Sequence, residues 1–139
     1  MSNPGPATTV TANYPNIANN QAVSLLGVAR GVNVNQTGDT QIQLQQGVTT
    51  YSVFQVVLTN ASISLTTAAA GLFTAPGAGG TAIVANAALS GLTGSTIVSQ
   101  RTVASTAAVT SSGYLYFNVG TAQGAAATVD VYIFGYNFT

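Results

Sequence analysis

The amino-acid sequence predicts an all-β fold, an antiparallel sandwich or barrel of about eight strands. Short segments rich in Val, Ile, Thr, Tyr and Phe recur along the chain, and several of them alternate polar with apolar residues. Gly, Asn and Ser separate these segments at intervals typical of turns. The 139 residues are 47% hydrophobic, which suits a single domain with its own core.

The expected strands lie, in order, near residues 23–29, 32–35, 41–45, 53–58, 62–66, 72–74, 97–103, 114–119 and 129–136. In the segment 53–58, alternation places Phe54 on the same face as Val56 and Leu58. In the last segment, Val129, Val131 and Ile133 share one face, and Asp130, Tyr132, Phe134 and Tyr136 share the other. Because both faces are largely apolar, we expect this strand to be covered twice, by the core and by a loop, a short helix or another subunit.

Two segments depart from the strand pattern. Residues 82–89 are expected to form a short helix, because Thr81 suits its N-cap and Gly91 follows its end, although an apolar run of this length also suits a strand. Residues 1–20 hold three of the four prolines and are expected to form an extended N-terminal arm. Residues 21–139 then form one β-sandwich domain.

Charge is the unusual feature of the composition. Only 3% of the residues are charged, where an ordinary domain has about 25%. The four charged residues are Arg30, Asp39, Arg101 and Asp130. A surface with so little charge has little protection against association, and protein interfaces are depleted of charge at their centres. We therefore expect a homo-oligomer, a dimer or a trimer.

The same composition argues against an enzyme. The chain has no His, Cys, Lys or Glu, the residues that supply most general acids and bases, activated nucleophiles and zinc ligands. We expect no cofactor and no metal. Two arginines at zero net charge do not make the basic surface that nucleic acid requires. No signal-like segment or run of about 18 apolar residues occurs, so we expect no membrane partner and assembly in the cytoplasm.

The two carboxylates are expected to have structural roles. Asp130 lies inside a predicted strand, and a carboxylate buried there needs a partner. Arg101 or Arg30 is expected to supply it, as an ion pair within one subunit or between subunits. Asp39 lies between predicted strands, where its side chain is expected to bond the nearby backbone of a turn.

Two segments resemble a known group of proteins. Residues 71–84 read GLFTAPGAGGTAIV and are followed by LSGLT at 89–93, and residues 114–136 read YLYFNVGTAQGAAATVDVYIFGY. This pattern resembles the cement, or head-decoration, proteins on the outside of tailed-bacteriophage capsids. The resemblance covers residues 71–136, and the first half of the chain matches only in character.

The resemblance implies an eight-stranded antiparallel jelly roll that oligomerises. It implies a virion protein, assembled in the host cytoplasm, that binds the major capsid protein on the capsid exterior and stabilises the shell against the pressure of packaged DNA. The expected contact residues are Tyr132, Phe134 and Tyr136 of the last strand and Tyr14 of the arm. The alternatives are a tail or head-fibre module that binds a host receptor or glycan, and a secreted polysaccharide-binding or adhesin sandwich.

Overall fold

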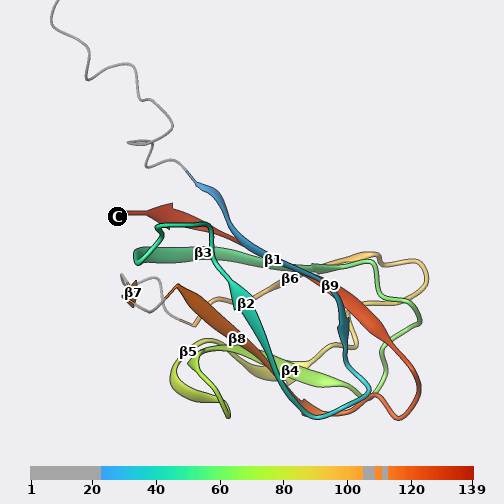
Figure 1. Ribbon diagram of the computed structural model, residues 1–139. Coiled ribbons are helices and arrows are strands. Elements are labelled where there is room, and N and C mark those ends of the chain that lie inside the picture. The colour runs from blue at the N-terminus through green and yellow to red at the C-terminus, as the bar shows by residue number, and fades with distance from the viewer. Residues whose placement is uncertain (1–22, 105–108, 111–112) are drawn as a thin grey trace, which may run out of the picture.

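The computed structural model describes residues 23–104, 109–110 and 113–139 and confirms an all-β fold of two stacked antiparallel sheets (Figure 1). Its strands are β1 (Ser24–Asn33), β2 (Gly38–Gln43), β3 (Thr50–Thr59), β4 (Ala69–Ala75), β5 (Gly79–Ala88), β6 (Val98–Arg101), β7 (Val109–Thr110), β8 (Tyr114–Thr121) and β9 (Thr128–Asn137). The expected arm, residues 1–20 with Tyr14, lies outside the described residues. No helix in the described part of the chain has the length and hydropathy needed to cross a bilayer.

The strand order is that of a jelly roll. The first sheet runs β1-β9-β3-β6, with the two-residue β7 pairing with β3, and the second runs β2-β8-β4-β5. Apart from β7, the strands pair from the outside of the chain inward: β1 with β9, β2 with β8, β3 with β6, and β4 with β5. This nested pairing wraps the chain into a double Greek key, with one sheet facing the other.

One continuous hydrophobic core fills the space between the sheets. Side chains that the first sheet buries include Leu26, Tyr51, Val53, Val56, Leu58, Val129, Val131 and Ile133, and those of the second include Ile42, Leu72, Ile83, Leu115, Phe117 and Val119. Alternation in β9 is confirmed, because each buried residue of this strand is followed by a half-buried one that faces outward.

The helix expected at residues 82–89 is wrong, because Gly79–Ala88 form the edge strand β5. Ala82 and Val84 pair with Phe73 and Leu72 of β4, with a register shift between the two pairs. The shift places the adjacent residues Ile83 and Val84 both in buried positions. Pairing with β4 therefore determines the conformation of this segment, and the local helix-capping residues do not.

The strand expected at residues 62–66 is also wrong, because this segment is a loop. Leu65 is buried and donates its N–H to the carbonyl of Leu92 (2.9 Å). The N–H of Thr66 bonds the side-chain oxygen of Gln123 (3.1 Å). Leu65 is thus packed onto the core while Ile63 is exposed, so the alternating polarity at 62–66 does not mark a strand with one buried face.

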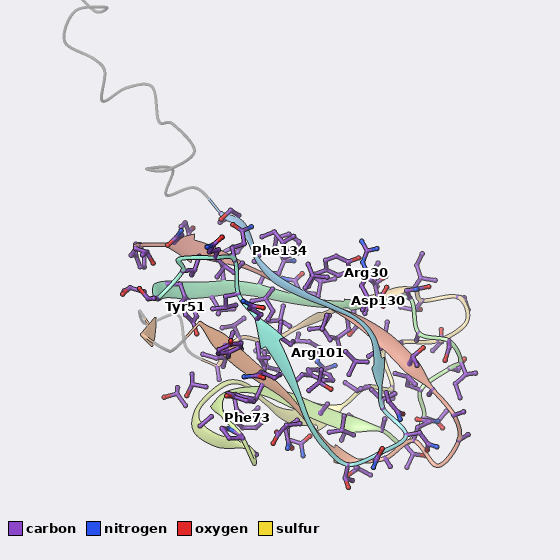
Figure 2. The ribbon with its side chains drawn as sticks, viewed as in Figure 1. Arg30, Tyr51, Phe73, Arg101, Asp130 and Phe134 are labelled. Carbon is purple, nitrogen blue, oxygen red and sulfur yellow. The ribbon has the colours of Figure 1, made fainter. Side chains whose placement is uncertain are left out.

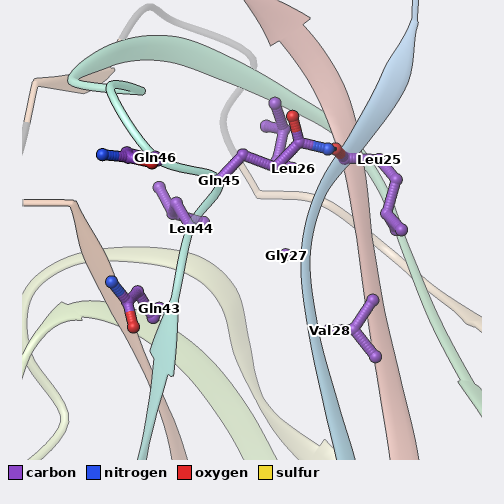
Figure 3. A pocket seen from close by; sticks show the side chains of 8 residues that line it. All are labelled: Leu25, Leu26, Gly27, Val28, Gln43, Leu44, Gln45 and Gln46. Atoms are coloured by element: carbon purple, nitrogen blue, oxygen red, sulfur yellow. Dashed lines mark hydrogen bonds between the residues drawn. The ribbon is translucent and has the colours of Figure 1, made fainter.

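The two open sides of the sandwich are closed differently. On one side Gly27 of β1 forms a bridge with Leu44, the residue after β2. There Gln45 donates its N–H to the carbonyl of Leu26 (2.8 Å) and its side-chain amide to the carbonyl of Leu25 (Figure 3). On the other side, where β5 and β6 are the edges, the N–H of Ala104 bonds the carbonyl of Ile83 (2.7 Å).

Candidate protein-contact surface

The outward face of the first sheet carries a row of apolar and aromatic side chains. Tyr132, Phe134 and Tyr136 of β9 lie half-buried along its centre. In the register of the sheet, Val28 and Val57 flank Tyr132 on the neighbouring strands. We call the following set the aromatic face: Leu25, Val28, Phe54, Val57, Tyr132, Phe134, Tyr136 and Phe138. Three of the four contact residues expected from the sequence therefore share one surface.

An aromatic cluster forms one end of this face. The rings of Phe54 and Tyr136 meet edge to face, with centroids 6.0 Å apart, and those of Tyr136 and Phe138 stack with centroids 6.3 Å apart. Phe54 is 50% exposed and Phe138 is 44% exposed. Aromatic side chains held in this way offer a large contact area at a low cost in conformational entropy.

Phe54 was placed on the wrong face by simple alternation. The register between β3 and β9 shifts between Val53 and Gln55, so that Phe54 is the extra residue of a bulge. Val53 and Val56 are buried on either side of it, and Phe54 is turned outward. Residues 53–58 read VFQVVL, which is apolar at five of six positions, so the sequence gives no signal for the position of the bulge.

Within one subunit, Asp130 bonds neutral groups in place of the expected arginine, and an ion pair between subunits stays a prediction. One carboxylate oxygen of Asp130 accepts the N–H of Gly31 (2.8 Å) and the other accepts the side-chain amide of Asn60 (3.1 Å). Arg101 pairs with the inward-facing residue Val56 and so lies on the inner side of the sheet, whereas Asp130 faces outward. Figure 2 shows Arg101 between the two layers and Arg30 on the outer side of the upper layer.

Asp39 does not act as the turn residue that was expected. It lies in β2, where its carboxylate accepts the side-chain amide of Asn118 (2.9 Å) on the neighbouring strand. Its other oxygen accepts the N–H of Gly77 (2.7 Å) in the connection between β4 and β5. Each of the two acidic side chains in the sequence therefore receives hydrogen bonds from distant segments of the fold.

The outward face of the second sheet is polar by comparison. Its outward side chains on β2 and β8 are Asp39, Gln41, Gln43, Tyr114, Tyr116 and Asn118. The side-chain amide of Gln41 donates to the hydroxyl of Tyr116 at the long distance of 3.5 Å. The outward side of β2 and β8 is therefore richer in amides, and Phe73 of β4, the strand partner of Tyr116, adds a buried ring beside them. The first sheet carries Asp130 as well as the aromatic face on its outward side.

A separate groove lies on the side of the sandwich where β5 and β6 are the edges. Its lining residues are Val84, Ala85, Ala87, Gln100, Arg101, Thr102 and Ala104. The guanidinium of Arg101 donates to the carbonyl of Ala88 (3.1 Å), and burial lowers the pKa of Arg101 from its ordinary value. Sequence reasoning placed this arginine beside Asp130 and missed the groove, because the groove depends on which strands become edges.

Within residues 23–104, 109–110 and 113–139, no group of three or more His, Cys, Asp or Glu side chains is arranged to hold a metal ion.

Comparisons of the chain with protein-family models, with curated proteins and with solved structures gave no match. The surfaces described above are therefore the basis for functional inference.

Proposed function

We propose that this chain is a structural virion protein, a cement protein that self-associates and binds the outer surface of the major capsid protein through its aromatic face. The observation that carries the proposal is the aromatic face itself, a set of eight apolar and aromatic side chains on the outward side of the first sheet in which Phe54 and Phe138 are half-exposed. Contiguous apolar patches on a protein surface mark sites of association. The resemblance of residues 71–136 to head-decoration proteins supports the choice of partner.

The energetics suit a clip between neighbouring subunits of a shell. Burial of apolar surface contributes about 25 cal/mol per Å², from which the costs of association are subtracted. Phe54 and Phe138 are rigid, half-exposed rings of the kind that anchor interfaces. The binding free energy of a single contact of this type is modest. Every symmetry-related copy in a shell adds its own contribution, so the total free energy needed to separate the capsid subunits is large.

Particle stability tests the proposal. Capsids assembled with and without this chain are filled with DNA and heated, and DNA release is followed with an intercalating dye. We expect particles without the chain to release DNA at a lower temperature. Equal release temperatures at full occupancy of the chain contradict the cement role.

A matched pair of variants tests the surface. Tyr136→Ser removes the central ring of the aromatic cluster, whereas Tyr116→Ser removes a tyrosine from the polar face. We expect Y136S to lower occupancy of the capsid by roughly tenfold or more at a fixed protein concentration, as for an aromatic anchor, and Y116S to bind as the native chain does.

The polar face supports a second candidate, a tail or head-fibre module that binds a host glycan or receptor. Amide groups and tyrosine side chains together offer the hydrogen bonds and flat apolar surfaces that a sugar ring requires, and Gln41, Tyr116 and Asn118 lie on this face. Imaging of labelled particles separates the two candidates. Copies over the whole head favour the cement role, and copies confined to the tail favour the fibre module.

A further inference from the structure

A hollow at the connection between β1 and β2 is separate from the aromatic face. Its volume is about 250 Å³, and its lining residues are Asn33, Gln36, Thr37, Gly38, Asp39 and Thr40. Apart from Gly38, each of these residues has a polar side chain. A Cβ at Gly38 would meet no atom within 4 Å, so the space beside this backbone is open. Because pockets for drug-sized ligands measure ~300–1,000 Å³, the hollow suits one small polar unit.

The polar groups of the hollow retain much of their hydrogen-bonding capacity. The side-chain oxygen of Asn33 accepts the N–H of Asn35 (2.8 Å), which leaves the two amide N–H donors of Asn33. The side chains of Gln36 and Thr37 make no hydrogen bond to the part of the chain that the structure describes. Together these groups offer both donors and acceptors to a ligand that is rich in hydroxyl groups.

The outward side of the second sheet continues from the hollow as a row of amide and tyrosine side chains. We call this set the tyrosine row: Gln41 and Gln43 of β2 with Tyr114, Tyr116 and Asn118 of β8. Asp39 lines the hollow and pairs with Asn118, so the row begins where the hollow ends. Tyr116 is two residues from Asn118 on the same face of β8, about 7 Å away. An extended ligand that leaves the hollow therefore meets Asn118 and then Tyr116.

Tyr116 has an aromatic neighbour in the sheet. Phe73 of β4 pairs with Tyr116 and is buried. Paired residues of neighbouring strands have their side chains on the same side of the sheet, so Phe73 and Tyr116 lie next to each other on the outward side. Tyr116 itself is half-buried. A half-buried ring with a second ring beside it offers a flat apolar surface and a hydroxyl group, which suits the C–H face of a sugar ring.

Charge decides the class of ligand. Of the four charged side chains in the sequence, Asp39 alone belongs to this site. Arg30 and Asp130 lie on strands of the first sheet, and Arg101 lines the groove between β5 and β6. A site with one carboxylate and no cation disfavours phosphate groups and acidic sugars. Both carboxylate oxygens of Asp39 already accept hydrogen bonds from neutral groups, so the site favours an uncharged ligand over a cation.

We propose that the hollow and the tyrosine row together bind an uncharged glycan, with one sugar in the hollow and the next sugar on Tyr116. The proposal goes beyond the cement role. It deepens the second candidate function, on whose polar face it rests, and it does not require the chain to lie at the tail. The outward faces of two stacked sheets point in opposite directions (Figure 1). A chain bound to a capsid through the aromatic face would therefore present this site to the solvent.

A panel of oligosaccharides tests the proposal by nuclear magnetic resonance on the native chain in solution. The panel contains neutral hexamers of glucose, mannose, galactose and N-acetylglucosamine, and a hexamer of hyaluronan, which shares N-acetylglucosamine but is anionic. We expect at least one neutral hexamer to shift the backbone amides of residues 36–43 and 114–118. We expect hyaluronan to shift none of them.

A matched pair of glutamine variants locates the site. Gln41→Ala removes an exposed amide of the tyrosine row, whereas Gln100→Ala removes an exposed amide from β6 of the first sheet. We expect Q41A to weaken binding of the neutral hexamer about fivefold, as for an uncharged hydrogen bond, and Q100A to bind as the native chain does. Tyr116→Ser is expected to weaken glycan binding about tenfold, as for the loss of an aromatic contact.

Three results overturn the proposal. They are the absence of shifts with every neutral hexamer, stronger shifts with hyaluronan than with the neutral hexamers, and shifts centred outside residues 36–43 and 114–118. The panel is compared on the native chain, so it decides the proposal even where the Y116S variant does not fold.

Failure of this proposal is distinguishable from failure of the proposed functions. The cement role is measured by DNA release from capsids, which requires no glycan. Copies over the whole head together with glycan binding in solution would remove the fibre module and leave the glycan site standing.

Discussion

The carboxylate of Asp130 accepts the backbone N–H of Gly31 at 2.8 Å, although the two residues are 99 positions apart in the sequence. In the register of β1 against β9, Ala29 pairs with Val131 and Val32 with Val129, so a bulge of two residues faces Asp130. Gly31 completes the bulge with a φ of 65°, which favours glycine. The carboxylate of Asp130 thus stabilises this bulge by accepting hydrogen bonds from neutral donors.

Removal of the charge at Asp130 is expected to destabilise the fold. In Asp130→Asn an amide group replaces one of the two accepting oxygens, so either Gly31 or Asn60 loses its acceptor. We expect the free energy of unfolding to fall by about 1–2 kcal/mol, measured by urea denaturation. Arg30→Gln, which changes an exposed charge in the same bulge, serves as the control and is expected to change stability by less than about 0.5 kcal/mol. A native midpoint for D130N contradicts the prediction.

Gly135 is expected to tolerate no side chain. A Cβ at this position of β9 would collide with the carbonyl oxygen of Ser52 and would lie 2.9 Å from Cδ1 of the buried Leu26. We expect Gly135→Ala to lose about 3 kcal/mol or more in thermal unfolding, at or above the upper end for overpacked cores. Gly94→Ala is the matched control, because its Cβ would meet only Ser64 at 3.9 Å. Similar melting temperatures for both variants would contradict the prediction and would show that the backbone at Gly135 shifts to accommodate a Cβ.

Gln123 is expected to hold the loop before β4. Its buried side-chain oxygen accepts the N–H groups of Thr66, Thr67 and Ala68, each at 3.1 Å. Gln123→Leu leaves these donors without that acceptor, and we expect a loss of about 3 kcal/mol and faster hydrogen exchange at the three amides. Gln123→Glu keeps an acceptor and is expected to lose less. Equal losses for the two variants would mean that side-chain volume, rather than the acceptor, matters.

Self-association is expected to depend on the aromatic face and to be insensitive to salt. Because none of the eight residues of the aromatic face is charged, and Asp130 on the same side of β9 already accepts hydrogen bonds from two neutral groups, the dissociation constant of the native chain should change by less than about threefold between ~0.1 and ~0.5 M NaCl. Phe54→Ser should weaken association, measured by sedimentation equilibrium, and Tyr116→Ser should not. A native chain that remains a monomer at high concentration contradicts this prediction.

The sequence alone predicted the fold class and the alternation of β9, because both depend on local patterns. Val131 and Tyr132 face opposite ways whatever the neighbouring strands do. Three features depend on pairing and were missed: the outward turn of Phe54, the strand conformation of residues 82–88, and the partners of Asp130. Each depends on a bulge or a sheet edge that exists only once two strands pair. The register of that pairing cannot be predicted from a single sequence.

The residues of the aromatic face were predicted in part, and their contact with a partner stays a prediction. Tyr132, Phe134 and Tyr136 lie on the aromatic face, as the pattern of β9 indicated, whereas Phe54 and Phe138 joined them through tertiary structure. The position of Arg101 on the inner side of the sheet follows only from its strand partner Val56, whose side chain is buried on the same side.

The nested pairing order has a consequence for synthesis. β9 is the last of the described strands to leave the ribosome, yet it lies between β1 and β3. Until it arrives, β1 and β3 have no common neighbour, and the nascent chain exposes their backbone hydrogen-bonding groups to other chains. Contacts of such long sequence separation also slow folding. A lower growth temperature, which weakens hydrophobic association of the exposed chain, should therefore raise the yield of native protein, whereas truncation before Thr128 should send the product to inclusion bodies.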